Sequence, residues 1–203
     1  MPQLIRLAML LPAFVFLLLA AVGYPPIDRF PLTKTVFPNA SSLPSVDGVG
    51  PVTELGVGMW GQCTIDTAGH RSCRGESQVV YNIDLISSSN ETVSVCVNQR
   101  GEVEARPIAL LSLLVGIIAS LASDDREINR CSLGMSVAGS FAVFMTFLFD
   151  VMFFSSIGNE MHALHDFSKT SLGGAFWLNF AAMLLLLMDG IYSIRLAIAQ
   201  SNR

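Results

Sequence analysis

Charged residues are scarce in this chain. Only 14% of its 203 residues are Asp, Glu, Lys or Arg, whereas 52% are hydrophobic, and the mean hydropathy is +0.55. Soluble domains carry about 25% charged residues, so we expect much of the apolar surface to face lipid. The net charge of −4 leaves no basic stripe that would bind nucleic acid. Nucleic acid is therefore excluded as a partner.

Catalytic motifs are also missing from the sequence. It contains no Gly-x-Ser-x-Gly, no His-Glu-x-x-His, no P-loop and no dinucleotide-binding fingerprint. We therefore predict that the protein is not an enzyme and uses no cofactor. No catalytic, cofactor-binding or metal-ligating residue is assigned.

Long apolar runs, in contrast, are present. They predict transmembrane helices at residues 4–22, 107–123, 131–157 and 175–194 of a single tetraspan domain, 1–203. About 20 residues cross the ~30 Å hydrocarbon core, and such spans are helical because lipid offers no hydrogen-bond partners. The second run is short, and we expect it to extend through Arg106 or Ser123 by snorkelling.

The first run has an alternative interpretation. Arg6, the apolar stretch and the small residues Ala20, Ala21 and Gly23 also describe a secretory signal peptide. The length of the run, roughly 19 residues, exceeds the usual apolar region of a signal peptide and favours a retained helix.

The distribution of basic residues predicts the orientation. The side of the termini, which includes the loop 124–130 and the tail 195–203, carries five arginines: Arg6, Arg126, Arg130, Arg195 and Arg203. The short loop 158–174 carries only Lys169. The positive-inside rule makes the termini cytoplasmic. Loops 23–106 and 158–174 are then extracellular, and the first of them carries two glycosylation sequons, at Asn39 and Asn90.

The first outer loop changes texture along its length. Residues 24–52 are rich in proline and are expected to form a tether. Stretches 52–58, 59–66, 78–86 and 92–97 favour β-strands and predict a small antiparallel sheet.

Four cysteines are present. Cys63 and Cys73 flank the turn sequence 66–69, so a disulfide between them is geometrically easy and would contribute about 2 to 4 kcal/mol. Cys96 either pairs between chains or stays buried and free. Cys131, at the inner membrane edge, is a candidate for palmitoylation or a buried structural cysteine.

The segment from Gly58 and Trp60 through Cys63 to Cys73 resembles the Gly-Leu-Trp-x2-Cys-x8-10-Cys signature of claudins and their relatives. The proline-bearing exit from the first helix and the long outer loop are most similar to the fungal PalI and eisosome tetraspan family. The resemblance implies a left-handed four-helix transmembrane bundle with a small disulfide-bonded extracellular β-sheet, in which Trp60 packs beside the disulfide. The chain departs from claudins in its longer outer loop and in its end, Ser-Asn-Arg, which makes tight-junction sealing doubtful.

Two acids, Asp150 and Asp189, lie within the third and fourth runs. We expect both to point inward, separated in depth by roughly 16 Å at 1.5 Å per residue, so they cannot share a proton as an aspartyl protease dyad does. One hypothesis pairs Asp189 with Arg195 or Arg130, and Asp150 with a donor such as Lys169. Another uses Asp150 in a cation pathway.

The second outer loop carries His162 and His165 beside acidic residues. Imidazoles next to carboxylates titrate near neutrality, which suggests an extracellular pH sensor. The alternative is a solvated polar loop.

The leading functional hypothesis is a plasma-membrane structural and interaction protein. It would contact lipids and other membrane proteins, or copies of itself, and would organise membrane microdomains or a sensor complex such as one for ambient-pH response. The alternative is an accessory subunit of a channel or of low-affinity calcium uptake.

Overall fold

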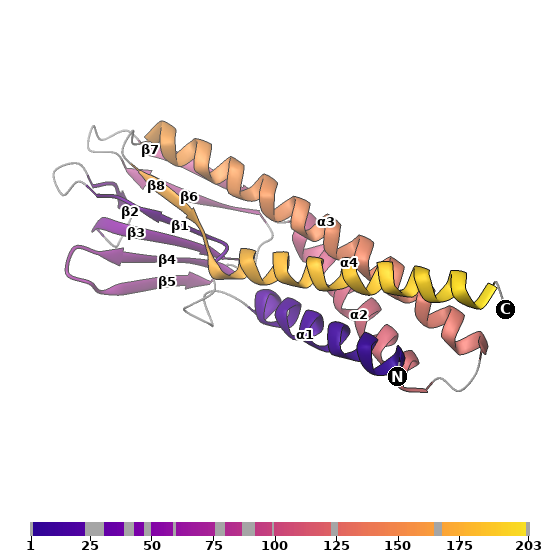
Figure 1. Ribbon diagram of the computed structural model, residues 1–203. Coiled ribbons are helices and arrows are strands. Elements are labelled where there is room, and N and C mark those ends of the chain that lie inside the picture. The colour runs from indigo at the N-terminus through magenta and orange to yellow at the C-terminus, as the bar shows by residue number, and fades with distance from the viewer. Residues whose placement is uncertain are drawn as a thin grey trace. The chain divides into compact units, whose positions relative to one another are not determined.

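The computed structural model describes residues 2–22, 31–38, 43–46, 50–58, 60–75, 80–86, 92–98, 100–122, 126–164 and 168–201. These residues contain four helices, α1 (Pro2–Val22), α2 (Arg100–Ala122), α3 (Arg126–Leu164) and α4 (Gly174–Ser201) (Figure 1). The chain divides into two compact units. The first comprises Met1–Ala21, Glu104–Leu148 and Leu178–Arg203, and the second comprises Val22–Val103 and Phe149–Trp177.

The helices of the first unit share one core. Along α1 the buried positions Leu10, Ala13, Leu17 and Ala20 are spaced alternately by three and four residues, which is the spacing of knobs-into-holes packing. All four helices contribute side chains to this core. Helix α1 contacts α2 through Arg106 and contacts α4 through Arg6 and Asp189. Helix α3 lies close to α2 at Gly139 and Leu113 and contacts α4 through Ser140 and Leu186.

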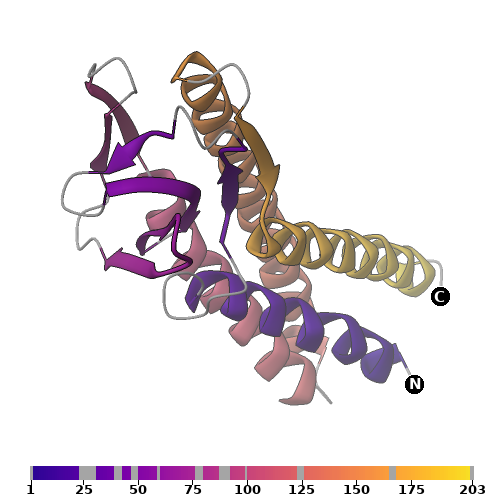
Figure 2. The ribbon, with the colours of Figure 1, turned by 90° about the vertical axis from the view of Figure 1, so that its left-hand side faces the viewer.

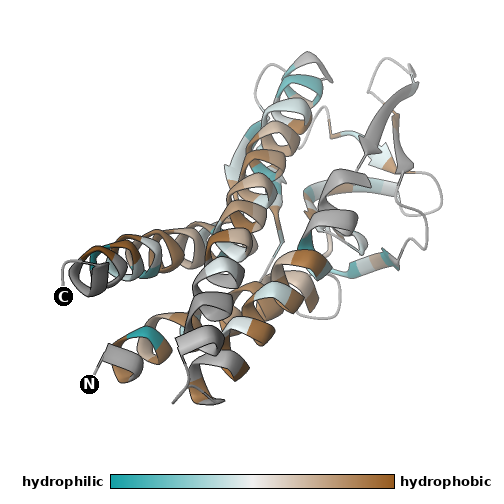
Figure 3. Ribbon diagram, turned by 90° about the vertical axis from the view of Figure 1, so that its right-hand side faces the viewer, coloured by the Kyte–Doolittle hydropathy of each residue, from teal (hydrophilic) through white to brown (hydrophobic). Residues whose placement is uncertain are grey.

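Three of the helices are long and apolar enough to cross a membrane. These spans are Leu4–Val22, Val137–His162 and Gly174–Arg195. No more than 39% of the most apolar stretch of any of them is buried within the chain, so most of the apolar surface is left to face lipid, and Figure 3 shows hydrophobic residues along the helices. The described part of α2 has a shorter apolar stretch, Arg106–Ile118. These are the features of an integral membrane protein, and the crossing of α2 stays a prediction.

The second unit is built on an eight-stranded sheet. The described strand pairs are antiparallel, in the order β5-β4-β3-β2-β6-β7, with β1 pairing with both β3 and β8. The strands are β1 (Thr33–Val36), β2 (Ser45–Val46), β3 (Gly50–Gly58), β4 (Gly61–Asp66), β5 (Arg71–Gly75), β6 (Val80–Ile86), β7 (Thr92–Asn98) and β8 (Lys169–Leu172).

Four strands agree with the sequence and two correct it. Strands β3, β4, β6 and β7 confirm the four β-favouring stretches to within two residues at each end. The expectation of a tether over residues 24–52 is wrong at β1 and β2, which fall inside it. In β1, Thr33 and Thr35 are buried while Lys34 between them is half-buried, as expected for a strand with one face covered. The prolines of residues 24–52 do not prevent β1 from pairing with other strands, because β1 itself contains no proline.

The second connection, residues 158–174, also differs from the expected loop, because its described residues include helix and strand. Helix α3 continues to Leu164, and β8 then pairs with β1, so that segments far apart in the sequence lie side by side (Figure 2). The hydroxyl oxygens of Thr35 and Thr170 are 3.1 Å apart across this pair. The amide of Gly173 donates to the carbonyl of Leu32 at 2.8 Å, which fixes the chain where β8 passes into α4.

Candidate functional site

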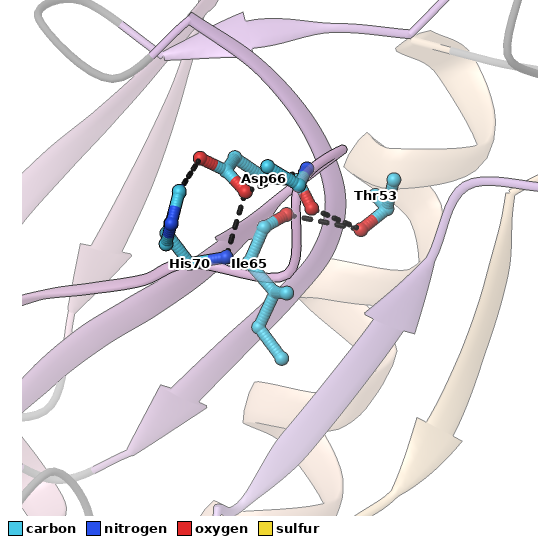
Figure 4. Close-up of polar contacts among 5 residues, drawn as sticks. Thr53, Ile65, Asp66 and His70 are labelled. Carbon is cyan, nitrogen blue, oxygen red and sulfur yellow. Dashed lines mark hydrogen bonds and ion pairs between the residues drawn. The ribbon is translucent and has the colours of Figure 1, made fainter.

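The turn between β4 and β5 is organised by Asp66. Its Oδ1 accepts hydrogen bonds from the backbone amides of Ala68 and His70, both at 2.8 Å, and its Oδ2 lies 3.2 Å from Nδ1 of His70 (Figure 4). Gly69 has φ of 82°, a left-handed conformation that glycine adopts without steric cost. The expected turn over residues 66–69 is thus confirmed.

These contacts also affect the charge of Asp66. The pKa of its carboxyl is lowered from 3.8, chiefly because the His70 amide donates to the carboxylate. A desolvation effect opposes this shift, while the Ala68 amide and the His70 ring reinforce it. The ionised carboxylate is therefore the form that holds the turn.

The expected disulfide between Cys63 and Cys73 is present. The two residues are directly opposite each other in the β4–β5 register, with Cα atoms 4.0 Å apart. Cys63 is buried and Cys73 is exposed, so the bond joins the interior of the sheet unit to a strand at its surface. Turn and disulfide together make β4–β5 a rigid hairpin.

Trp60 lies in the connection between β3 and β4. Gly58 and Gly61 pair on either side of it, and 42% of the tryptophan is exposed. This large apolar side chain is thus partly exposed, directly before the strand that carries Cys63. Its packing against the disulfide stays a prediction.

Both acids of the long helices are buried, as expected for inward-pointing side chains. Asp150 is 1% exposed and Asp189 is 0% exposed. On α4 the buried positions Asn179, Ala182 and Leu186 precede Asp189 at intervals of three and four residues, which places them on one helix face. The acids therefore lie on the packed faces of their helices.

Asp189 forms an ion pair with Arg6 of α1. Arg6 Nε is 3.4 Å from Asp189 Oδ1, and the two side chains are 7% and 0% exposed. The sequence predicted Arg195 or Arg130 as partners and missed Arg6. Arg195 is exposed, and the side chain of Arg130 lies outside the described part of the chain.

Arg106 also differs from the prediction. Instead of snorkelling to the interface it is 2% exposed, and its Nη1 donates to the carbonyl oxygen of Ala20 at 2.9 Å. The last four carbonyls of a helix have no intrahelical partner, so this arginine of α2 caps the C-terminal end of α1.

The remaining sequence-predicted residues are only partly placed. His162 is exposed in the last turn of α3. Asn39, Asn90 and His165 lie outside the described residues. Cys96 and Cys131 belong to β7 and α3, and their side chains are outside the described part. The two histidines and the modification sites thus stay predictions.

Within the described ranges no group of three or more His, Cys, Asp or Glu residues could hold a metal ion. No protein-family model matches the sequence, and no curated protein sequence matches it. The resemblance to claudins and the PalI family therefore stays a prediction from the sequence.

Proposed function

We propose that this protein is a claudin-like, PalI-like tetraspan of the plasma membrane, which uses its outer sheet to contact other membrane proteins or copies of itself. Such contacts would organise membrane microdomains or a sensor complex. The observation that carries the proposal is the pairing of β8, between α3 and α4, with β1, between α1 and α2. The two connections thereby form one folded unit, as a binding module requires.

This strand pairing also supports four membrane crossings. Strands of one sheet must lie on the same side of a membrane, because an exposed backbone cannot pair across lipid. If α3 crosses the membrane, its first residues lie on the side opposite to β8, which follows its last residues. Strand β7 belongs to the same sheet as β8 and precedes α2, so α2 must also cross to bring the chain from β7 to the start of α3. If α1 and α4 cross as well, both termini lie together, which the positive-inside rule makes the cytoplasmic side.

A contact surface within the described sheet lies at Trp60, which directly precedes β4 of the hairpin. Tryptophan is enriched among the residues that dominate binding energy at protein interfaces, and Trp60 is exposed beside a disulfide-linked strand. A rigid hairpin loses little conformational freedom on binding. We therefore assign Trp60 as the main contact residue.

Cross-linking in intact membranes tests this function. The chain, isolated after cross-linking, should carry a reproducible set of neighbours, and Trp60→Ala should lose them. Trp177→Ala is the matched control, because Trp177 is 55% exposed but belongs to α4. An uncross-linked monomer, or equal losses with both variants, would refute the proposal.

Ambient-pH response is the specific role proposed for such a complex, with His162 and His165 as the candidate sensor residues. The support is the exposure of His162 at the end of α3. It lies in the same unit as the sheet, so its charge could act on the contact surface.

The transport alternative rests on Asp150, a carboxylate that is 1% exposed on a long apolar helix. A buried acid within a membrane helix often marks an ion pathway. Expression of the chain alone should then increase calcium uptake, and Asp150→Asn should abolish the increase. Unchanged flux would dismiss this alternative.

A further inference from the structure

The first and last helices are joined by the buried contact between Arg6 and Asp189, 183 positions apart in the sequence. We propose that this ion pair is an assembly lock. It makes α1 a permanent part of the folded protein and stabilises the docking of α4.

The need for such a lock follows from the position of the acid. Asp189 is 0% exposed and lies within the candidate span Gly174–Arg195. It is six residues before the end of that span, or roughly 9 Å at 1.5 Å per residue. A short aspartate side chain cannot reach water over this distance, and an acid within a span is costly unless it has a partner.

The two members of the pair are not equivalent. Arg6 lies two residues inside the candidate span Leu4–Val22, and a long arginine side chain can extend to the membrane surface from there. Without Asp189, Arg6 therefore has an alternative. Without Arg6, Asp189 loses its guanidinium and has no comparable route to water.

The opposite end of α1 is held independently. Arg106 of α2 donates to the carbonyl of Ala20, near the end of α1 at Val22. The helix is thus tied to α4 near its start and to α2 near its end. Excision of the first helix as a signal peptide would remove both contacts. The lock therefore requires that α1 is retained in the mature protein.

A double-mutant cycle on the full chain tests the lock, with the amount of protein in the membrane and its melting temperature in detergent as readouts. Breaking a buried pair is strongly destabilising, whereas replacing both partners by apolar residues is tolerated. Arg6→Leu should lower the amount several-fold, and Asp189→Leu should lower it less. The double variant Arg6→Leu/Asp189→Leu should recover to near the native amount.

Arg195→Leu is the control, because it removes an exposed arginine from α4 and should leave the amount unchanged. Losses that simply add in the double variant, or a loss with Arg195→Leu equal to that with Arg6→Leu, would overturn the lock. Peptide mapping of the purified protein should recover residues of α1, and their absence would overturn retention. No readout involves a partner, so the outcome is independent of the proposed function.

Discussion

Replacement of Gly173 by alanine is the sharpest test of how the connection between α1 and α2 is joined to the connection between α3 and α4. A Cβ at this position would overlap the carbonyl oxygen of Pro31 and would lie 2.6 Å from its carbonyl carbon. Both are backbone atoms, so no side-chain rotation relieves the overlap. The strand must move, which weakens the bonds from the amides of Gly173 and Ala175 to Leu32 and Pro31.

The expected cost can be estimated from these contacts. Overpacking costs about 1 to 3 kcal/mol, and each weakened hydrogen bond adds up to about 1 kcal/mol, so we expect a loss of about 3 kcal/mol. For a protein of this size that corresponds to a decrease of about 6 to 12 °C in melting temperature.

Thermal unfolding of the purified protein in detergent measures this decrease. Gly158→Ala is the matched control, because Gly158 is helical, belongs to the same unit and has no atom within 4 Å of an added Cβ. It should be neutral or slightly stabilising. Equal melting temperatures for Gly173→Ala and the native protein would show that β8 and β1 are not joined as described.

Three further predictions concern the hairpin and the two histidines, His162 and His165. Cys63→Ala/Cys73→Ala should destabilise the protein by about 2.7 kcal/mol in the chain-entropy account, measured by melting with and without reductant. Asp66→Asn should increase amide exchange in the hairpin at pH 7. Because the pKa of Asp66 is lowered from 3.8, its stabilisation is complete at higher pH and is lost as the pH falls through the lowered value, so native and variant should converge once the pH is below that value. His162→Ala/His165→Ala should abolish a cellular response to alkaline pH, and an unaltered response would end the sensor hypothesis.

Local features of the fold were predictable from the sequence. The long apolar run of α1, the β-branched stretches of β6 and β7, and the turn after Asp66 each carry their signal within a few residues. The disulfide between Cys63 and Cys73 belongs with them, because a turn between two strands brings nearby cysteines opposite each other. Short-range periodicity and turn chemistry decide such elements.

Features that depend on distant partners were not predictable. Strand β1 is four residues long and acquires its identity from β3 and β8, and no pattern within four residues specifies such pairing. The partner of Asp189 illustrates the same point. Arg195 is nearer to Asp189 in the sequence, but six residues at 3.6 per turn place it about 240° around the helix from Asp189. Arg6 lies on another helix and contacts Asp189 on its buried face.

The four-crossing arrangement is tested by mapping the side of the membrane on which each segment lies. The starting chain lacks Cys96 and Cys131, and each variant carries one added cysteine. The variants are Thr67→Cys in the β4–β5 turn, Ser123→Cys between α2 and α3, and a cysteine added at either terminus. Each variant is treated on intact cells with a membrane-impermeant maleimide. Four crossings with cytoplasmic termini predict labelling at position 67 alone, with the other sites labelled only after permeabilisation. Labelling at Ser123 in intact cells would contradict the crossing of α2, and with it the tetraspan arrangement.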